Sequence, residues 1–421
     1  MAGHSAAASV GGRTEEAGAA WLRADTVVVA HGVILRGPVV ALAPVLGQIR
    51  QDLEVSSAVV GLLVTLPVLC FGLGTAGASR LIARLGVRRA LDVAVAVIAG
   101  GLLLRVAGGA AAAIAGTVLL GLAITVANVA VPVVTQTRGG AGQRVTTWYV
   151  VVMNLFSLVA TVMTAPVAAA VGWRAAVTVP WVVVAACLAW LLRLRRVRTE
   201  LPGHVPPPVR GALVADRRAT AVALLLMTGF AGQTFGYYAI TSWLPTQLEQ
   251  VLGASLVGAG LSAALFQAGG VIGPFAIGPA LRHWRVTTVF LVIGALWMLY
   301  PVGMLLLPHL WWSWGLAAGV AQGATFTLVL SLVAAVSPDQ HRARQTSALV
   351  QGGGYAAGAI GPVALAAAHE LSGAWTVPML IVLAAVLMLA VAGTAAALLV
   401  RRDVEHLREK AVMPAEGGDS R

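Results

Sequence analysis

The sequence predicts an all-α polytopic membrane protein with twelve membrane-spanning helices, arranged as two related halves of six. Three observations predict this fold class: an extremely apolar composition, a regular series of long apolar segments, and arginines gathered on one side of those segments. Of the 421 residues, 59% are hydrophobic and only 10% are charged, and the mean hydropathy is +0.88. A soluble domain carries roughly 25% charged residues because its surface faces water. Lipid is therefore the expected solvent for most of this chain.

A helix needs about 20 consecutive apolar residues to cross the hydrocarbon core of a bilayer. Twelve segments meet this requirement. An Ala/Gly/Ser-rich segment over 1–25 precedes the first of them, and a Pro- and Arg-rich stretch over 195–218 separates the first six from the last six. The predicted spans cover 26–46, 57–78, 90–107, 113–134, 145–170, 175–194, 219–245, 255–280, 286–307, 312–336, 344–368 and 375–400.

The basic residues fix the expected orientation of these spans. With the N-terminus in the cytoplasm, 24 of the 28 Lys and Arg residues fall on the cytoplasmic side, and three (Arg50, Arg105 and Arg174) fall at or near the outer side. Both termini are thus expected to be cytoplasmic in a multi-pass protein of the cell membrane. The net charge of +12 follows from this bias and predicts no nucleic-acid partner, because the basic residues lie in short clusters between apolar runs.

The expected organisation is a disordered cytoplasmic tail (1–25), a six-helix bundle (26–194), a cytoplasmic linker (195–218), a second six-helix bundle (219–400) and a cytoplasmic tail (401–421). The two bundles resemble each other with a period of about 200 residues. Pro44 matches Pro245, and Pro166 matches Pro362, in the same order within each half. Coincidence in low-complexity sequence is the alternative, but it does not account for matched prolines, glycines and basic turns in order.

Several local motifs resemble those of a known family. They are the segment from Leu35 to Gly72 (LRGPVVALAPVLGQIRQDLEVSSAVVGLLVTLPVLCFG), NVAVP from Asn128, YYAITSWLPTQL from Tyr237, LFQAGGVIGP from Leu265 and QGGGYAAGAIGP from Gln351. Together they resemble the major facilitator superfamily, and within it the cyanate / 2-nitroimidazole transporter branch. The resemblance implies alternating access, with substrate bound between the halves and with spans 1, 4, 7 and 10 lining the cavity.

The superfamily's turn after span 2 commonly reads G-x-x-x-D-R-x-G-R-R. This chain has Ser79 at the first glycine and Ala83 at the aspartate, so the usual carboxylate of that turn is missing. Asp92, at the base of span 3, is a candidate replacement. By this resemblance the expected gating residues are Arg84, Gly86, Arg88 and Asp92.

Arg36 is the one arginine that the charge bias leaves inside a span, about halfway through the first helix. An ionisable group at that depth costs roughly 3 kcal/mol or more, so it is usually functional or paired. No Asp or Glu occurs at mid-depth in any predicted span. Arg36 is therefore predicted to attract a small anion or a polar solute with a strong acceptor group. A structural arginine bonded to backbone carbonyls is the alternative.

Other polar side chains are expected at similar depth. The candidate substrate-binding residues besides Arg36 are Asn128, Asn154, Tyr237, Tyr238, Gln267, Gln322 and Tyr355, and Gln233 and Gln351 share their depth. Interhelical hydrogen bonding is the alternative role for each of them. The resemblance ranks Asn128, Tyr237, Tyr238 and Gln322 first. Arg105, near the outer end of span 3, is expected to snorkel to the outer interface or to face the outer vestibule.

The function predicted from these patterns is secondary active transport of a small polar or anionic solute, such as a cyanate-like anion or a nitroimidazole-like compound. A drug or metabolite exporter of the same fold is the alternative. An enzyme is disfavoured because no cluster of catalytic side chains occurs, and no cofactor or metal site is expected. A channel is disfavoured by the internal duplication. The pKa range of a histidine suits proton coupling, so His31 is a candidate for that role, although a buried structural histidine is the favoured interpretation. The protein is expected to be a monomer.

Overall fold

The computed structural model describes residues 26–136, 140–193, 217–253 and 256–412. The predicted tail 1–25 and nearly all of the predicted linker 195–218 lie outside these residues. The first helix covers 26–40 and continues through η1 (Ala43–Val45) into α2 (Leu46–Asp52). The rest of the first half contains α3 (Ser57–Leu73), α4 (Thr75–Val106), α5 (Ala110–Gln136), α6 (Gly140–Val171), α7 (Trp173–Ala176) and α8 (Val179–Arg193).

The second half has the same helical character. It contains α10 (Arg217–Leu252), α11 (Leu256–His283), α12 (Val286–Leu306), η2 (Pro308–Leu310), α13 (Trp311–Ala335), α14 (Gln340–Ser372) and α15 (Thr376–Val412). The last helix continues beyond residue 400, so the first part of the predicted C-terminal tail is helical. No strand occurs in the described part of the chain.

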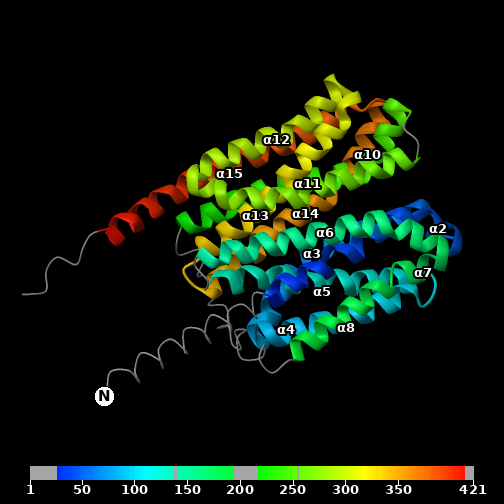
Figure 1. The fold of residues 1–421 in the computed structure, drawn as a ribbon, viewed down its shortest axis with the longest axis horizontal. Coiled ribbons are helices and arrows are strands. Elements are labelled where there is room, and N and C mark those ends of the chain that lie inside the picture. Colours follow the sequence, from blue (N-terminus) through cyan, green and yellow to red (C-terminus); the bar gives the residue numbers. More distant parts are fainter. Residues whose placement is uncertain (1–25, 137–139, 194–216, 254–255, 413–421) are drawn as a thin grey trace, which may run out of the picture.

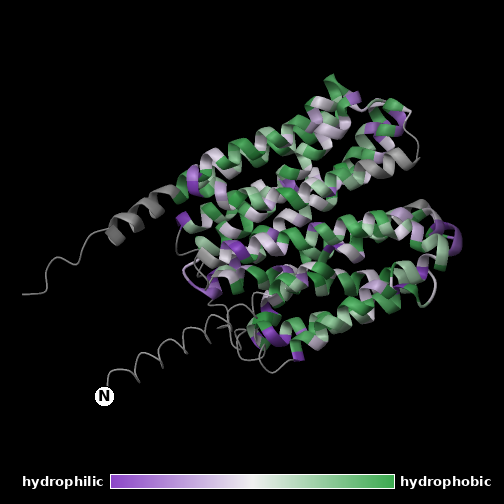
Figure 2. Cartoon of the chain, viewed as in Figure 1, coloured by the Kyte–Doolittle hydropathy of each residue, from purple (hydrophilic) through white to green (hydrophobic). Residues whose placement is uncertain are grey.

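The helices form because a lipid-facing backbone must satisfy its own hydrogen bonds, and within one segment only a helix does so. Figure 2 shows hydrophobic residues along the lengths of the helices and hydrophilic ones gathered mainly at their ends. Large apolar side chains such as Leu73, Val391 and Trp190 are exposed on the outer surface, where acyl chains would cover them. Nine helices of the described chain are long and apolar enough to cross a membrane by length and composition alone.

The other three spans come from α3, α4 and α14. The helix α4 is two helices joined at Gly86, whose φ of +77° suits glycine better than any other residue. Before this break, Ser79 contacts Arg344 near the start of α14; after it, Arg105 contacts Val177 beside α7. The chain thus reverses at Gly86, so that α3 with the start of α4 forms the second span and the rest of α4 forms the third. The helix α14 is the eleventh span, and the predicted twelve-span fold is confirmed.

The two halves form two bundles that lie one above the other in Figure 1, with α10–α15 above and the first helix through α8 below. Across their boundary, α3, α5 and α6 of the first half pack against α11, α13 and α14 of the second. Phe71 packs edge-on against Tyr355 with ring centroids 5.2 Å apart, and Trp148 packs edge-on against Phe275 at 5.3 Å. The bundles diverge towards the end where α2 and α7 lie. We call this the α2–α7 end, and the opposite end, where Gly86 and Arg344 lie, the Arg-rich end.

Candidate functional site between the two halves

Arg36 lies where the first helix is about to break. The helix ends at residue 40, just after Gly37 and Pro38, and a short 3-10 turn follows it. The Arg36 side chain is only 5% exposed. Its Nη1 donates a hydrogen bond of 3.0 Å to Oδ1 of Asn154 on α6. The guanidinium is thus held inside the protein by an amide and not by a carboxylate.

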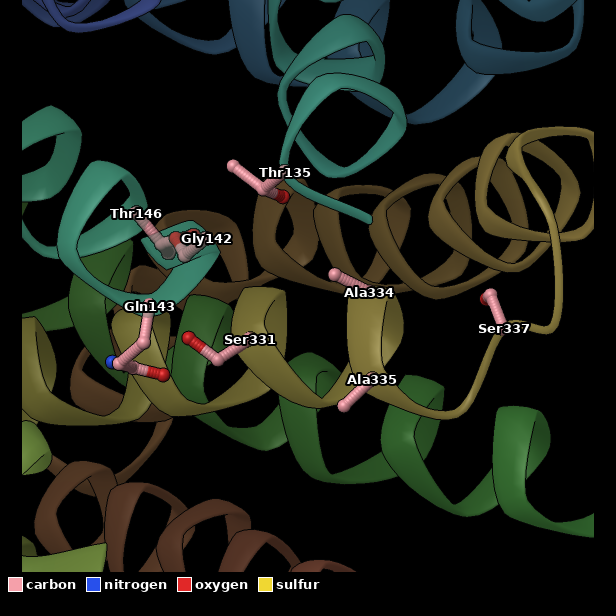
Figure 3. A pocket seen from close by; sticks show the side chains of 8 residues that line it. All are labelled: Thr135, Gly142, Gln143, Thr146, Ser331, Ala334, Ala335 and Ser337. Atoms are coloured by element: carbon pink, nitrogen blue, oxygen red, sulfur yellow. Dashed lines mark hydrogen bonds between the residues drawn. The ribbon is translucent and has the colours of Figure 1, made fainter. Parts of the chain in front are cut away.

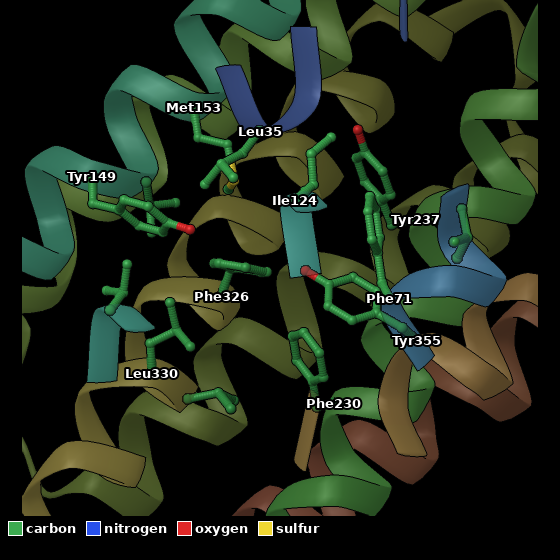
Figure 4. Close-up of a cluster of buried hydrophobic side chains, with 14 of the residues drawn as sticks. Leu35, Phe71, Ile124, Tyr149, Met153, Phe230, Tyr237, Phe326, Leu330 and Tyr355 are labelled. Atoms are coloured by element: carbon green, nitrogen blue, oxygen red, sulfur yellow. The ribbon is translucent and has the colours of Figure 1, made fainter. Parts of the chain in front are cut away.

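Aromatic rings from the second half stack on this guanidinium. Its Cζ lies 4.6 Å from the ring centroid of Tyr237 on α10 and 5.1 Å from that of Phe326 on α13, and both distances are within the range of cation–π attraction. Four of the five tyrosines in the chain surround Arg36: Tyr149, Tyr237, Tyr238 and Tyr355. Figure 4 shows three of them with Phe326, Phe230 and Phe71 in one cluster that takes side chains from both halves.

The charge of Arg36 has no acidic partner in the described chain. The one ion pair found there links Arg174 to Asp52 on the surface. The Nη2 of Arg36 is buried and has no hydrogen-bond partner among the described residues. A buried guanidinium with an unused donor group favours a bound anion or another strong acceptor. In the described chain Arg36 donates to the side chain of Asn154 and not to backbone carbonyls, so the structural alternative predicted for it is not observed.

A glycine brings two amide side chains together beside Arg36. The Nδ2 of Asn154 donates to the carbonyl oxygen of Gly270 on α11 at 2.9 Å, which ties the two halves together. A Cβ atom on Gly270 would lie 2.7 Å from Oε1 of Gln322 and 3.2 Å from Oδ1 of Asn154. Gln322 on α13 is therefore a close neighbour of the amide that holds Arg36. The Gln322 side chain is fully buried.

Two of the predicted residues, Gln267 and Asn128, stand one step further from the guanidinium. The Nε2 of Gln267 donates to Oη of Tyr237 at 3.3 Å, and Oη of Tyr149 donates to Oδ1 of Asn128 at 2.9 Å. Asn128 thus reaches Arg36 only through Tyr149, whereas Asn154, ranked lower from its span number, binds it directly. All eight predicted substrate-binding residues belong to this one cluster. Sequence reasoning missed Phe326 and Gly270, which have no polar side chain to mark them.

The predicted gating residues lie around the reversal of α4. Gly86 makes the reversal itself, Arg84 is exposed and Arg88 is half-buried. Asp92 has no ion pair in the described chain; it lines a surface groove between α4 and α8 that also contains Arg193. The contact from this region to the other half is made instead by Arg344, whose Nη1 donates to the carbonyl oxygen and to Oγ of Ser79 at 2.6 and 2.9 Å.

A cleft lies between the halves near the Arg-rich end. It has a volume of about 340 Å³ and is lined by hydroxyl, amide and small side chains from α5, α6 and α13 and by Ser337 just beyond α13 (Figure 3). The lining residues are Thr135, Gly142, Gln143, Thr146, Ser331, Ala334, Ala335 and Ser337. No charged side chain is among them.

Arg105 corrects one prediction from the sequence. Arg105 neither snorkels to the interface nor faces an open vestibule, because its side chain is only 1% exposed. Its Nη1 donates to the Pro38 carbonyl at 2.9 Å and its Nη2 to the Val177 carbonyl at 2.8 Å. Both carbonyls lie at breaks, one at the end of the first helix and one between α7 and α8, where helical partners are lost. Arg105 satisfies both and fixes the first helix two residues after Arg36.

Replacing Arg105 with alanine is therefore expected to destabilise the protein by about 3 kcal/mol, because two charge-assisted hydrogen bonds are lost and two carbonyls are left unpaired. The thermal unfolding midpoint of the purified protein would fall by several degrees. Arg174→Ala is the matched control, since its ion pair with Asp52 is 44% and 41% exposed and such pairs contribute little. Equal midpoints for the two variants would contradict the structural role of Arg105.

A helical membrane protein made of two six-helix bundles, with a polar site buried between them, has the architecture of a secondary transporter. Residues 33–347 match the family model of the Major Facilitator Superfamily, and the chain belongs to that superfamily.

Three curated relatives and several solved structures are similar to this chain. It is 27% identical over 386 residues to the uncharacterized transporter YycB of Bacillus subtilis (strain 168), covering 89% of this chain and 93% of that protein. It is 27% identical over 375 residues to the 2-nitroimidazole transporter of Escherichia coli (strain K12), covering 86% and 92%. It is 26% identical over 366 residues to the cyanate transport protein CynX of the same organism, covering 82% and 90%.

The solved structures share the fold at low identity. FucP in its outward conformation has a TM-score of 0.72 at 10% identity, covering 90% of this chain and 99% of FucP. The proton:xylose symporter XylE has a TM-score of 0.70 at 12% identity, covering 91% of this chain and 96% of XylE. The family model and the curated relatives confirm the resemblance to the superfamily and to its cyanate / 2-nitroimidazole branch.

Proposed function

We propose that this protein is a secondary active transporter that moves a small anionic or strongly hydrogen-bond-accepting solute across the cell membrane by alternating access. Arg36 is the principal binding group in this proposal. The observation that carries it is a buried guanidinium between the two halves, with one donor group unpaired and no carboxylate partner in the described chain. Such a charge is stabilised best when an anion neutralises it.

The relatives support the same chemistry. Cyanate is a small anion, and 2-nitroimidazole carries a nitro group with two acceptor oxygens; the proteins named for their transport are both similar to this chain over most of its length. Each solute offers the kind of acceptor that an unpaired guanidinium donor recognises.

The way the two halves meet, in contact at one end and apart at the other, supports alternating access. Hydrogen bonds cross between the halves at mid-depth, from Asn154 to Gly270, and near the Arg-rich end, from Arg344 to Ser79. The bundles diverge at the α2–α7 end (Figure 1), and the fold is similar to that of FucP in an outward conformation. If the Arg-rich end is cytoplasmic, as the charge bias predicts, this is the outward-facing state and both termini are cytoplasmic.

A ligand panel followed by uptake tests the proposal. Purified protein would be heated with cyanate, nitrate, small carboxylates and 2-nitroimidazole, and any solute that raises the unfolding midpoint would be offered to proteoliposomes. We expect at least one acceptor solute to stabilise the protein and to accumulate against its gradient, with a protonophore abolishing accumulation if protons drive it. Uptake that only equilibrates, under every imposed ion gradient, would contradict active transport.

A further inference from the structure

Two buried glutamines near Arg36 have amide groups that nothing in the described chain satisfies. Both Nε2 and Oε1 lack hydrogen-bond partners in Gln322 and also in Gln233, and both side chains are fully buried. Leaving a buried amide unsatisfied costs roughly 1–3 kcal/mol, and most buried polar groups in proteins are paired. Two such amides in one region therefore indicate a ligand that completes their hydrogen bonds.

Each amide lies about one helical turn from a ring that stacks on Arg36: Gln322 from Phe326 on α13, and Gln233 from Tyr237 on α10. Gln322 is placed beside Arg36 by Gly270 and Asn154. Gln233 lies three residues after Phe230 and four before Tyr237, so it shares their face of α10. Phe230 in turn packs against Phe326, one turn of α13 from Gln322, with ring centroids 5.6 Å apart.

The chemistry of these groups specifies more than a simple anion. An amide presents an acceptor and a donor side by side, so its complement is an edge that presents a donor beside an acceptor. Aromatic rings around the site, such as Tyr237 and Phe326, suit a flat solute. The full charge of Arg36, with no carboxylate of its own, is best matched by a full negative charge.

We propose that the substrate is a planar nitrogen-heterocyclic carboxylate, and that Gln322 is a specificity-determining residue. The carboxylate accepts from Nη2 of Arg36, while a ring N–H and the ring nitrogen directly bonded to it pair with the amide of Gln322, and Gln233 serves the far edge of the ring. This inference rests on the proposed function and narrows its substrate class. A linear anion such as cyanate satisfies Arg36 but leaves both glutamines unpaired, so it binds more weakly.

A pair of matched probes tests this directly on the full-length purified protein. Pyrazole-4-carboxylate and thiophene-3-carboxylate are both flat five-membered rings with one carboxylate, but only the first has a ring N–H beside a ring nitrogen. We expect the wild-type protein to bind the pyrazole probe at least 10-fold more tightly by titration calorimetry. Gln322→Leu should abolish that preference by weakening the binding of the pyrazole probe. Gln322→Met, closer in shape, serves if the leucine variant folds poorly, and Gln143→Leu in the cleft of Figure 3 is the control that keeps the preference.

The outcomes separate this inference from the proposed function. If both probes bind equally well and Arg36→Ala weakens both, the heterocycle inference is wrong and the anion site stands. The same holds if cyanate or 2-nitroimidazole binds more tightly than the pyrazole probe in an Arg36-dependent way. If no anion binds, or binding persists unchanged in Arg36→Ala, the proposed function itself is overturned.

Discussion

Replacing Arg36 with alanine is expected to abolish transport while the protein still inserts into the membrane and purifies in normal yield. In the proposed site the guanidinium is the positive group that faces the bound anion, and removing one partner of a buried charge pair typically costs 2–5 kcal/mol. Affinity should therefore fall roughly 100-fold or more. Uptake into proteoliposomes measures the transport loss, and calorimetry measures the affinity of the detergent-purified protein.

Arg36→Lys is expected to fail nearly as completely. A lysine ammonium cannot donate to Asn154 and to a substrate in one plane while stacking between Tyr237 and Phe326. Arg50→Ala is the matched control, since Arg50 is an exposed arginine on α2 and its loss changes the net charge equally. Transport kinetics in Arg36→Ala that match those of Arg50→Ala would contradict a binding role for Arg36.

The fold was predictable because the bilayer leaves few choices. Apolar length and arginine placement each constrain the spans, and each of the twelve predicted segments is largely helical in the part of the chain that the structure describes. The exact ends of the helices were less predictable. The sequence predicted a turn between the second and third spans, but the two helical segments run up to a single residue, Gly86, and its positive φ locates the break. Arg105 was misplaced because carbonyls freed by two distant helix breaks cannot be seen in the sequence beside it.

The members of the candidate site were predictable, but their contacts were not. Polar side chains at mid-depth are rare enough in this chain to stand out one by one. Which of them meet depends on how helices from the two halves pack. Asn154 contacts Arg36 because a glycine at position 270 lets α6 and α11 approach closely, and a glycine carries no chemical mark of that role. Asn128 on α5 instead accepts a hydrogen bond from Tyr149 on α6, so it lies further from Arg36 than Asn154 does.

Replacing Arg344 with alanine is expected to open the protein at its Arg-rich end. Arg344 is fully buried near the start of α14, and its two hydrogen bonds to Ser79 cross from the second half to the first. Ser79 stands where the superfamily turn usually has glycine, and the aspartate of that turn is replaced by Ala83. Arg344 thus supplies from the other half an interaction that the turn cannot make through a carboxylate of its own.

The size of the effect follows from the kind of bond lost. Hydrogen bonds that involve a charged group contribute roughly 1.5–3 kcal/mol, so the equilibrium between states closed and open at this end should shift by at least about 10-fold. A cysteine placed at Ala334 in the cleft of Figure 3 reports the change, in a background with Cys70→Ala and Cys187→Ala. Labelling by a membrane-impermeant maleimide, applied from the Arg-rich side, should be faster in the Arg344→Ala variant.

Arg342→Ala is the control that distinguishes loss of the Arg344–Ser79 hydrogen bonds from a simple change in surface charge. Arg342 lies in the first turn of the same helix, is half-buried and has no side-chain hydrogen bond to the first half in the described chain. Its removal alters the local charge equally but leaves the contact with Ser79 intact, so labelling should stay at the parental rate. Ser79→Gly should show a smaller increase than Arg344→Ala, because it removes the hydroxyl acceptor and keeps the carbonyl. Equal labelling rates in Arg344→Ala and Arg342→Ala would mean that packing of α3 against α14, and not this arginine, holds the halves together at that end.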